Sequence, residues 1–134
     1  MARKHGKLTI IKVGANDISA FCNSSEITRS ADTHDVTTYG NNSHRKDGGL
    51  LDGGFKASGF YDNTAATGPR FSVMTGIGTT QAITRQVEGT GTGKPQEVFN
   101  AVLTSYVESN PVADMITWSA EWEIDGDVTT TAQA

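Results

Sequence analysis

The residues best suited to chemistry are three histidines, one cysteine and several carboxylates. His34, which precedes Asp35, and His44 lie in a polar stretch with no cysteine or further histidine at the spacing that a zinc site needs. Glu121 and Glu123 would share one face of a strand, about 6.5 to 7 Å apart. A hydrolase pair would also need a cleft and a raised pKa. A solvated acidic face is the simpler interpretation, and no metal or catalytic site is predicted.

A glycine-rich segment at residues 89–94, GTGTGK, resembles a phosphate-binding loop only in part. The motif needs a glycine where Glu88 stands, and a serine or threonine where Pro95 stands. Cys22 has no basic neighbour in sequence that would lower the pKa of its thiol, so we interpret it as a small core residue. We therefore expect a protein that is not an enzyme and that uses no cofactor.

The composition indicates one β-rich domain over residues 1–134. The chain is 36% hydrophobic and contains 15 glycines but only 3 prolines, which is typical of strands joined by many turns. Its formal net charge of −4 argues against a protein that grips nucleic-acid phosphates. The basic residues near the start are interpreted as a solvated N-terminal arm, 1–6. No segment approaches the roughly 18 apolar residues of a membrane span.

Hydrophobic alternation predicts about seven strands and at most one short helix. The strands are expected over 7–13, 25–32, 36–39, 55–61, 81–87, 97–107 and 115–124. The segment 69–75, which begins with a proline, is expected to be the short helix. The pattern indicates an antiparallel β-sandwich or barrel.

The two last strands have the clearest pattern. In 115–124 apolar and polar residues alternate, so one face is expected to pack and the other to face water. The same alternation in 97–107 predicts that the two segments form an antiparallel hairpin. The expected core side chains are Phe55, Phe99, Leu103, Ile116, Trp118 and Trp122.

A long polar loop is expected over 40–54, GNNSHRKDGGLLDGG, because it contains five glycines and charges of both signs. Leu50 and Leu51 are interpreted as an anchor that holds this loop against a surface. Loops of this length are usually functional or disordered. The last residues, 125–134, have no pattern and are expected to form a C-terminal arm.

Two long stretches carry motifs of a known family. Residues 28–62, TRSADTHDVTTYGNNSHRKDGGLLDGGFKASGFYD, resemble segments that run SRSAD, DTTxFGD and GLxDGxxSxSGFYD in the major tail proteins, or tail tube proteins, of long-tailed bacteriophages. Residues 104–126, TSYVESNPVADMITWSAEWEIDG, are similar to that family's TSYExSxPVGDxVxFSAEFQxSG segment. The order and spacing of the motifs extend the resemblance over residues 7–126. The chain departs from the family at Gly68, Pro69 and Gly76, which interrupt the expected helix.

The resemblance implies a structural virion protein with an antiparallel β-sandwich flanked by a helix. In that family subunits close into a hexameric ring, and rings stack into a hollow tail tube around the tape-measure protein. Double-stranded DNA passes through without specific binding. The resemblance also implies contacts with baseplate and terminator proteins at the tail ends, and a place in the phage tail after synthesis in the host cytoplasm. No membrane insertion by this chain is expected.

Two sets of residues follow as candidates for assembly. Polar strand faces are expected to line the lumen, although the sequence leaves open which face turns inward: Glu26, Thr28, Ser30, Thr117, Ser119, Glu121 and Glu123. The loop over 40–54 and its flank are expected to reach between rings: Tyr39, Asn41, Asn42, His44, Arg45, Lys46, Asp47, Leu50 and Leu51.

Two other functions remain open on the sequence. One is a different virion ring or decoration protein, such as a tail terminator or a capsid-surface protein. The other is a carbohydrate-binding β-sandwich module. That module would need an exposed aromatic platform, whereas Trp118 and Trp122 fall on the apolar face of their strand.

Overall fold

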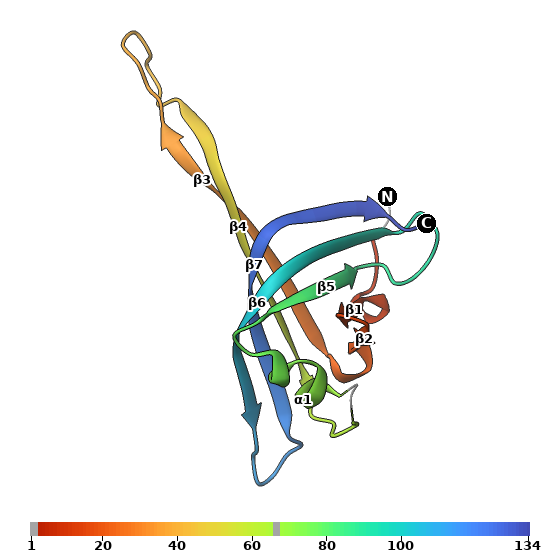
Figure 1. Cartoon of the computed structure of the whole chain (residues 1–134). Coiled ribbons are helices and arrows are strands. Elements are labelled where there is room, and N and C mark those ends of the chain that lie inside the picture. The colour runs from red at the N-terminus through yellow and green to blue at the C-terminus, as the bar shows by residue number, and fades with distance from the viewer. Residues whose placement is uncertain (1–2, 66–67) are drawn as a thin grey trace.

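Seven antiparallel strands form a single sheet in the order β2-β1-β5-β6-β7-β4-β3 in the computed structural model, which describes residues 3–65 and 68–134 (Figure 1). The strands are β1 (Ile10–Val13), β2 (Asn16–Asp17), β3 (Ser24–Asp35), β4 (Lys46–Phe60), β5 (Thr80–Gln86), β6 (Pro95–Ser109) and β7 (Thr117–Ala132). One short helix, α1 (Pro69–Ser72), and the 3₁₀ turns η1 (Gly6–Leu8), η2 (Ser19–Phe21) and η3 (Met74–Gly76) complete the described elements.

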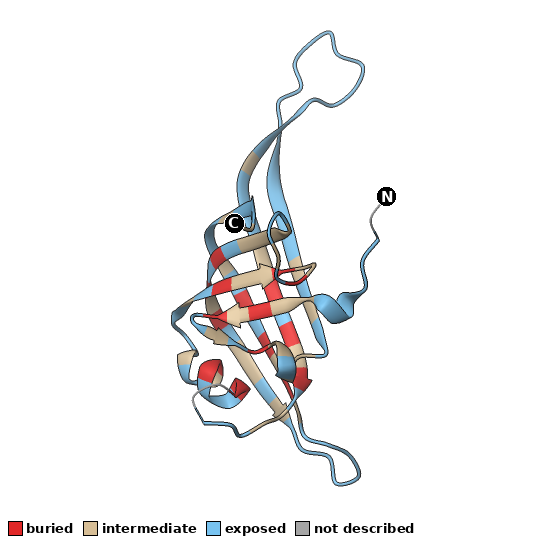
Figure 2. Ribbon diagram, turned by 90° about the vertical axis from the view of Figure 1, so that its right-hand side faces the viewer, coloured by how far each residue is buried: buried red, intermediate tan, exposed pale blue. Residues whose placement is uncertain are grey.

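The sheet curls around one hydrophobic core (Figure 2). The rings of Phe55 on β4 and Phe99 on β6 lie 5.7 Å apart, although β7 separates their strands in the sheet. Leu103, Trp118 and Trp122 are also buried. The expected mainly β, antiparallel fold with one short helix is therefore confirmed, and a single curled sheet does the packing that two sheets do in an ordinary sandwich.

Both tryptophans fasten short elements onto the sheet. The indole nitrogen of Trp118 donates a hydrogen bond of 3.1 Å to the carbonyl oxygen of Phe21 in η2. The indole of Trp122 donates one of 2.7 Å to Gln81 Oε1 on β5, and Gln81 Nε2 donates to the carbonyl oxygen of Val73 beside α1. Buried indoles usually find such partners, and here the partners close the ends of the core.

The segment expected as a loop over 40–54 is mostly strand. β4 begins at Lys46 and pairs with β3 from Asp35↔Lys46 onward, so only residues 36–45 connect the two strands. Gly53 has a packing role, since an added Cβ would clash with the carbonyl oxygen of Thr28 on the paired strand. Leu50 and Leu51 are exposed on this strand and do not anchor it to a surface.

The C-terminal residues expected as an arm, 125–134, continue β7 as far as Ala132. After Glu123 the strand bends through Gly126, whose φ of 85° suits glycine. Beyond the bend β7 pairs with the start of β6, from Pro95↔Ala132 to Val98↔Thr129. This half of β7 is rich in threonine and has a single half-buried apolar side chain, Val128, so it lacks the hydrophobic alternation by which a half-buried strand is recognised.

Two smaller expectations, for Ile116 and for the start of the first strand, differ from the structure, and a third, for the N-terminal arm, lies partly outside the described residues. Ile116, expected in the core, is 38% exposed because it precedes β7 at the open end of the sheet. The first strand begins at Ile10 rather than residue 7, because η1 occupies Gly6–Leu8. The first two residues of the expected N-terminal arm lie outside the described residues.

Candidate assembly surface

The outer face of β3, β4 and β7 carries polar side chains in rows that run across the sheet. Glu26 on β3 lies opposite Lys56 on β4, and Lys56 lies opposite Glu121 on β7. In the next row Ser58 lies opposite Ser119. Because side chains alternate between the faces of a strand, these residues point away from the core that their neighbours form.

The structure brings all seven sequence-expected lumen residues onto this one face. Glu26, Thr28 and Ser30 lie on β3, and Thr117, Ser119, Glu121 and Glu123 lie on β7. Strand β4 stands between them and pairs with both. We call this surface, together with Lys56, Ser58 and Phe60 of β4 and Ser105, Val107 and Ser109 of β6, the polar wall.

Two central residues of the polar wall, Lys56 and Ser58, were missed in the sequence. Both lie in β4, within the strand expected over 55–61. The alternation of FKASGFY contains the signal, because Phe55 and Ala57 are buried and the alternate residues Lys56 and Ser58 must point outward.

The polar wall has more acid than base. Lys56 Nζ lies 3.6 Å from Glu121 Oε1, and both side chains are more than half exposed, so this pair contributes little stability. Among the described residues, Glu26 and Glu123 have no ion-pair partner. The surface can accept hydrogen bonds and repel anions.

Both sides of the polar wall end in a strand edge without a neighbour in the described part of the chain. Strand β3 is the last strand of the sheet. On the other side β5 pairs with β6 only as far as Thr80↔Val102, so β6 is unpaired on that side from Thr104 to Ser109. Unpaired edges are templates for pairing with another chain.

A hairpin arm projects from the body (Figure 1). The pairing of β4 with β7 ends at Gly54↔Glu123, whereas the pairing of β4 with β3 continues to Asp35↔Lys46. Leu50 is 81% exposed and Tyr39 is fully exposed on this arm. Apolar side chains held so far from the core suit contact with another molecule.

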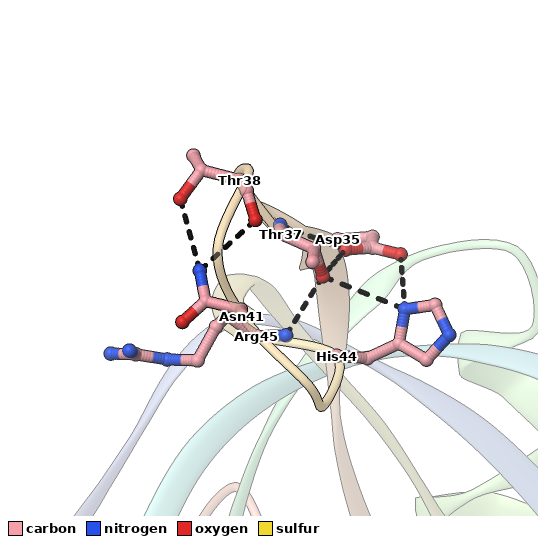
Figure 3. Close-up of polar contacts among 6 residues, drawn as sticks. All are labelled: Asp35, Thr37, Thr38, Asn41, His44 and Arg45. Atoms are coloured by element: carbon pink, nitrogen blue, oxygen red, sulfur yellow. Dashed lines mark hydrogen bonds and ion pairs between the residues drawn. The ribbon is translucent and has the colours of Figure 1, made fainter.

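Side-chain hydrogen bonds order the tip of the arm at residues 36–45 (Figure 3). The Thr37 hydroxyl donates to Asp35 Oδ1 at 2.5 Å and accepts a 2.8 Å hydrogen bond from the backbone N–H of Arg45. His44 Nδ1 lies 3.2 Å from Asp35 Oδ2. Asn41 Nδ2 donates to the carbonyl oxygen of Thr38 at 3.1 Å. The tip therefore has a defined shape.

The carboxylate of Asp35 takes part in three contacts of this network, two with Thr37 and one with His44. Hydrogen bonds from the side chain and backbone of Thr37 lower the pKa of Asp35, and His44 adds to the effect. The residue stays ionised at neutral pH, because these hydrogen bonds favour the charged form of the carboxyl group.

The opposite end of the molecule is the connection between β6 and β7, residues 110–116. Val112 is fully exposed and Met115 is 66% exposed. Beside this connection, Arg70 of α1 lies 3.4 Å from Glu108 on β6, and the hydroxyl of Tyr106 donates to the same carboxylate. These contacts hold α1 against β6 and leave the connection itself free to contact other molecules.

The described residues contain no group of three or more side chains able to hold a metal ion. Burial, with a smaller contribution from Asp17, raises the pKa of the Cys22 thiol to about 12, which suits a packed side chain rather than a nucleophile. None of the described helices has the length and apolar character needed to cross a membrane.

The curled sheet, the polar wall and the projecting hairpin together define a mainly β fold of the tail-tube type. The chain superposes on a structure of the SPP1 tail tube with a TM-score of 0.78 and 9% identity, covering 98% of this chain and 80% of that one. It matches the tail of an empty gene transfer agent (GTA) particle, with C6 symmetry, at a TM-score of 0.73 and 15% identity over 98% of this chain and 100% of that one.

A third match is the sheath–tube complex of an extracellular contractile injection system, PVC, in its extended state. The TM-score is 0.74 at 19% identity over 98% of this chain and 93% of that chain. Neither a protein-family model nor a curated protein matches the sequence. The shared fold is thus visible in the tertiary structure at identities that pairwise sequence comparison does not detect.

Proposed function

We propose that this protein is the structural subunit of a phage-type tail tube, closing into hexameric rings that stack around a channel. The proposal is carried by one observation, the polar wall with an unpaired strand edge on either side. Cyclic closure would pair every such edge and leave none exposed. The C6 symmetry of the similar GTA tail supports six subunits per ring.

Strand direction favours this closure. The wall has the strand order β6-β7-β4-β3, and each of its neighbouring pairs is antiparallel. Because the number of strands is even, β3 of one subunit runs opposite to β6 of the next around a rotation axis. Every seam in the ring is then an antiparallel pair, which can be formed by backbone hydrogen bonds alone.

In this arrangement the polar wall lines the channel. DNA carries one negative charge per roughly 1.7 Å of its axis, and basic surfaces hold it by releasing counterions. The wall carries mainly serine, threonine and glutamate, with Phe60 and Val107 as exposed apolar side chains. Its acids outnumber its one base, Lys56, so it has little such attraction. Double-stranded DNA would therefore slide through without specific binding, after the tape-measure protein has left the channel.

The hairpin arm would reach the neighbouring ring. It stands clear of the body, carries exposed Tyr39, Leu50 and Leu51, and has an ordered tip. Baseplate and terminator proteins would meet the same surfaces at the ends of the tube. The protein would thus belong to the tail of a virion.

The runner-up functions have less support. A carbohydrate-binding module needs an exposed aromatic platform. Trp118 and Trp122 are each 1% exposed, and the exposed rings of Tyr39, Phe60 and Phe71 lie on separate segments. A terminator or decoration ring would not need an arm that reaches a further ring of the same protein.

Electron microscopy of the purified protein at high concentration tests the proposal. Stacked rings with a central channel are expected. A protein that stays monomeric at every concentration, and after addition of preformed tube ends, would contradict it.

Labelling tests which face lines the channel. In a background with Cys22→Ser, a heavy-metal maleimide on Ser119→Cys should add density inside the channel. The matched control is Ala65→Cys, an exposed position outside the polar wall, which should add density outside the channel. Label from Ser119→Cys on the outer surface would show that the wall faces the other way.

Shortening the arm tests its role between rings. Replacing residues 38–43 by two glycines should leave the subunit folded and able to form rings, because these residues are exposed and the hydrogen bonds of Asn41 stay within the tip. Stacking should be lost. Normal tubes from this variant would remove the tip from the contact between rings.

A further inference from the structure

A groove lies where the arm leaves the body. β4 pairs with β7 only up to Gly54↔Glu123, after which β7 bends at Gly126 while the arm continues outward. The groove between the base of the arm and the bend of β7 has a volume of about 310 Å³. A cavity of roughly 150 Å³ holds one benzene molecule, so this groove has room for more than one aliphatic side chain.

The groove combines apolar side chains with charged side chains of both signs. Its lining side chains are Arg29, Leu51, Asp52, Ile124, Asp127 and Val128. Ile124 and Val128 are half-buried against the core, whereas Leu51 is 65% exposed. Arg29 has no ion-pair partner within the described ranges. Arg29 is therefore the one base of the groove, beside the two acids Asp52 and Asp127.

The connection between β6 and β7 has the matching chemistry. Val112 and Met115 are its exposed apolar side chains, and Asp114 between them makes no ion pair with any described residue. The Asp114 carboxylate is held in place by a 2.7 Å hydrogen bond from the backbone N–H of Met115. Two aliphatic side chains and one carboxylate thus face the solvent in a single short loop.

The groove and the loop cannot meet within one subunit, because the arm leaves the body beside the bend of β7, whereas the β6–β7 connection lies at the end of the body away from the arm (Figures 1 and 2). We propose that the β6–β7 connection of one subunit docks into the groove at the base of the arm of a second copy in the next ring. Val112 and Met115 would cover Leu51 and Ile124, and Asp114 would pair with Arg29.

This inference rests on the proposed tube function and adds the direction of stacking. A contact between two different surfaces of the same chain repeats without end when it does not close on itself. Each ring would then offer grooves at one end and loops at the other. The tube would be polar, and growth would continue from either end until another protein covers the exposed surface.

Disulfide crosslinking tests the contact. In a Cys22→Ser background, Leu51→Cys combined with Val112→Cys should give a ladder of covalent oligomers when assembled tubes are oxidised. The matched control combines Val112→Cys with Thr28→Cys, which lies on the opposite face of the arm base and should give no ladder. Both altered side chains of the test pair are exposed, and circular dichroism checks that each variant is folded.

The outcomes separate the groove from the tube function. A ladder from the Leu51 and Val112 pair alone supports the docking. Tubes that form but show no ladder, or an equal ladder from the control pair, overturn the docking and leave the tube function intact. Protection of Leu51→Cys from maleimide without a ladder also overturns it, by showing a different occupant. Failure of the unaltered protein to stack overturns both.

A charge exchange tests the ion pair separately. Arg29→Asp and Asp114→Arg should each raise the concentration needed for tube formation about tenfold, the size expected for one close charge pair at an interface. The double variant should recover most of this loss. If the double variant assembles no better than the single ones, Arg29 and Asp114 are not partners.

Discussion

Replacing Trp118 by alanine should unfold the subunit at a much lower temperature without altering the surfaces used for assembly. Trp118 is 1% exposed, and its ring stacks on Tyr106 with centroids 6.1 Å apart. Its indole N–H donates to the carbonyl oxygen of Phe21. The residue therefore joins β7, β6 and the η2 turn, and alanine would leave a cavity among the three.

The magnitude follows from two contributions. Loss of a buried aromatic side chain, including the cavity that it leaves, costs about 3 to 5 kcal/mol of the free energy of unfolding. The control Trp118→Phe keeps most of the apolar volume but leaves the Phe21 carbonyl without its donor, which costs about 1 to 3 kcal/mol. At about 4 °C per kcal/mol for a domain of this size, alanine should lower Tm by about 12 to 20 °C and phenylalanine by about 4 to 12 °C.

The assay is thermal and urea unfolding followed by far-ultraviolet circular dichroism, since tryptophan fluorescence changes with the substitution itself. Tube formation is then measured well below both melting temperatures. An alanine variant that melts within about 2 °C of the unaltered protein would refute the packing argument. A variant with the expected Tm that fails to assemble while folded would show that Trp118 also shapes a contact surface.

The close approach of η2 to β4 predicts that Gly59→Ala is strongly destabilising, because the added Cβ would lie 1.7 Å from the carbonyl oxygen of Phe21; Gly48→Ala, with nothing within 4 Å, is its control, and equal melting temperatures would contradict the prediction. At the arm tip, Thr37→Val should raise the pKa of Asp35 towards its ordinary value, because the hydroxyl hydrogen bond that lowers it is lost. Since the folded-state pKa is lowered, the order that Asp35 gives the tip is present above its ordinary pKa and is lost as pH falls through the lowered value. Carboxyl NMR titration measures this shift, and an unchanged pKa would show that Thr37 does not stabilise the carboxylate.

The sequence predicted side-chain orientation best in strands that have one buried face and one solvent-exposed face. In the C-terminal hairpin, alternation placed Trp118 and Trp122 on one side and Glu121 and Glu123 on the other, and the structure has them so. It was least informative where a strand has few buried side chains. The arm and the second half of β7 are held by backbone pairing and carry glycine or threonine, so they leave no hydrophobic period to detect.

Sequence alone determined the fold class, the absence of a catalytic motif and the tail-tube resemblance, because these depend on residue types and their local spacing. Only the tertiary structure decided that residues 46–54 are strand, that the polar wall is one surface, and that a groove opens beside Leu51. Those features depend on which strands are neighbours and where their pairing stops. Pairing across a sheet joins residues that are far apart in the chain. Local residue patterns therefore do not show which strands are neighbours.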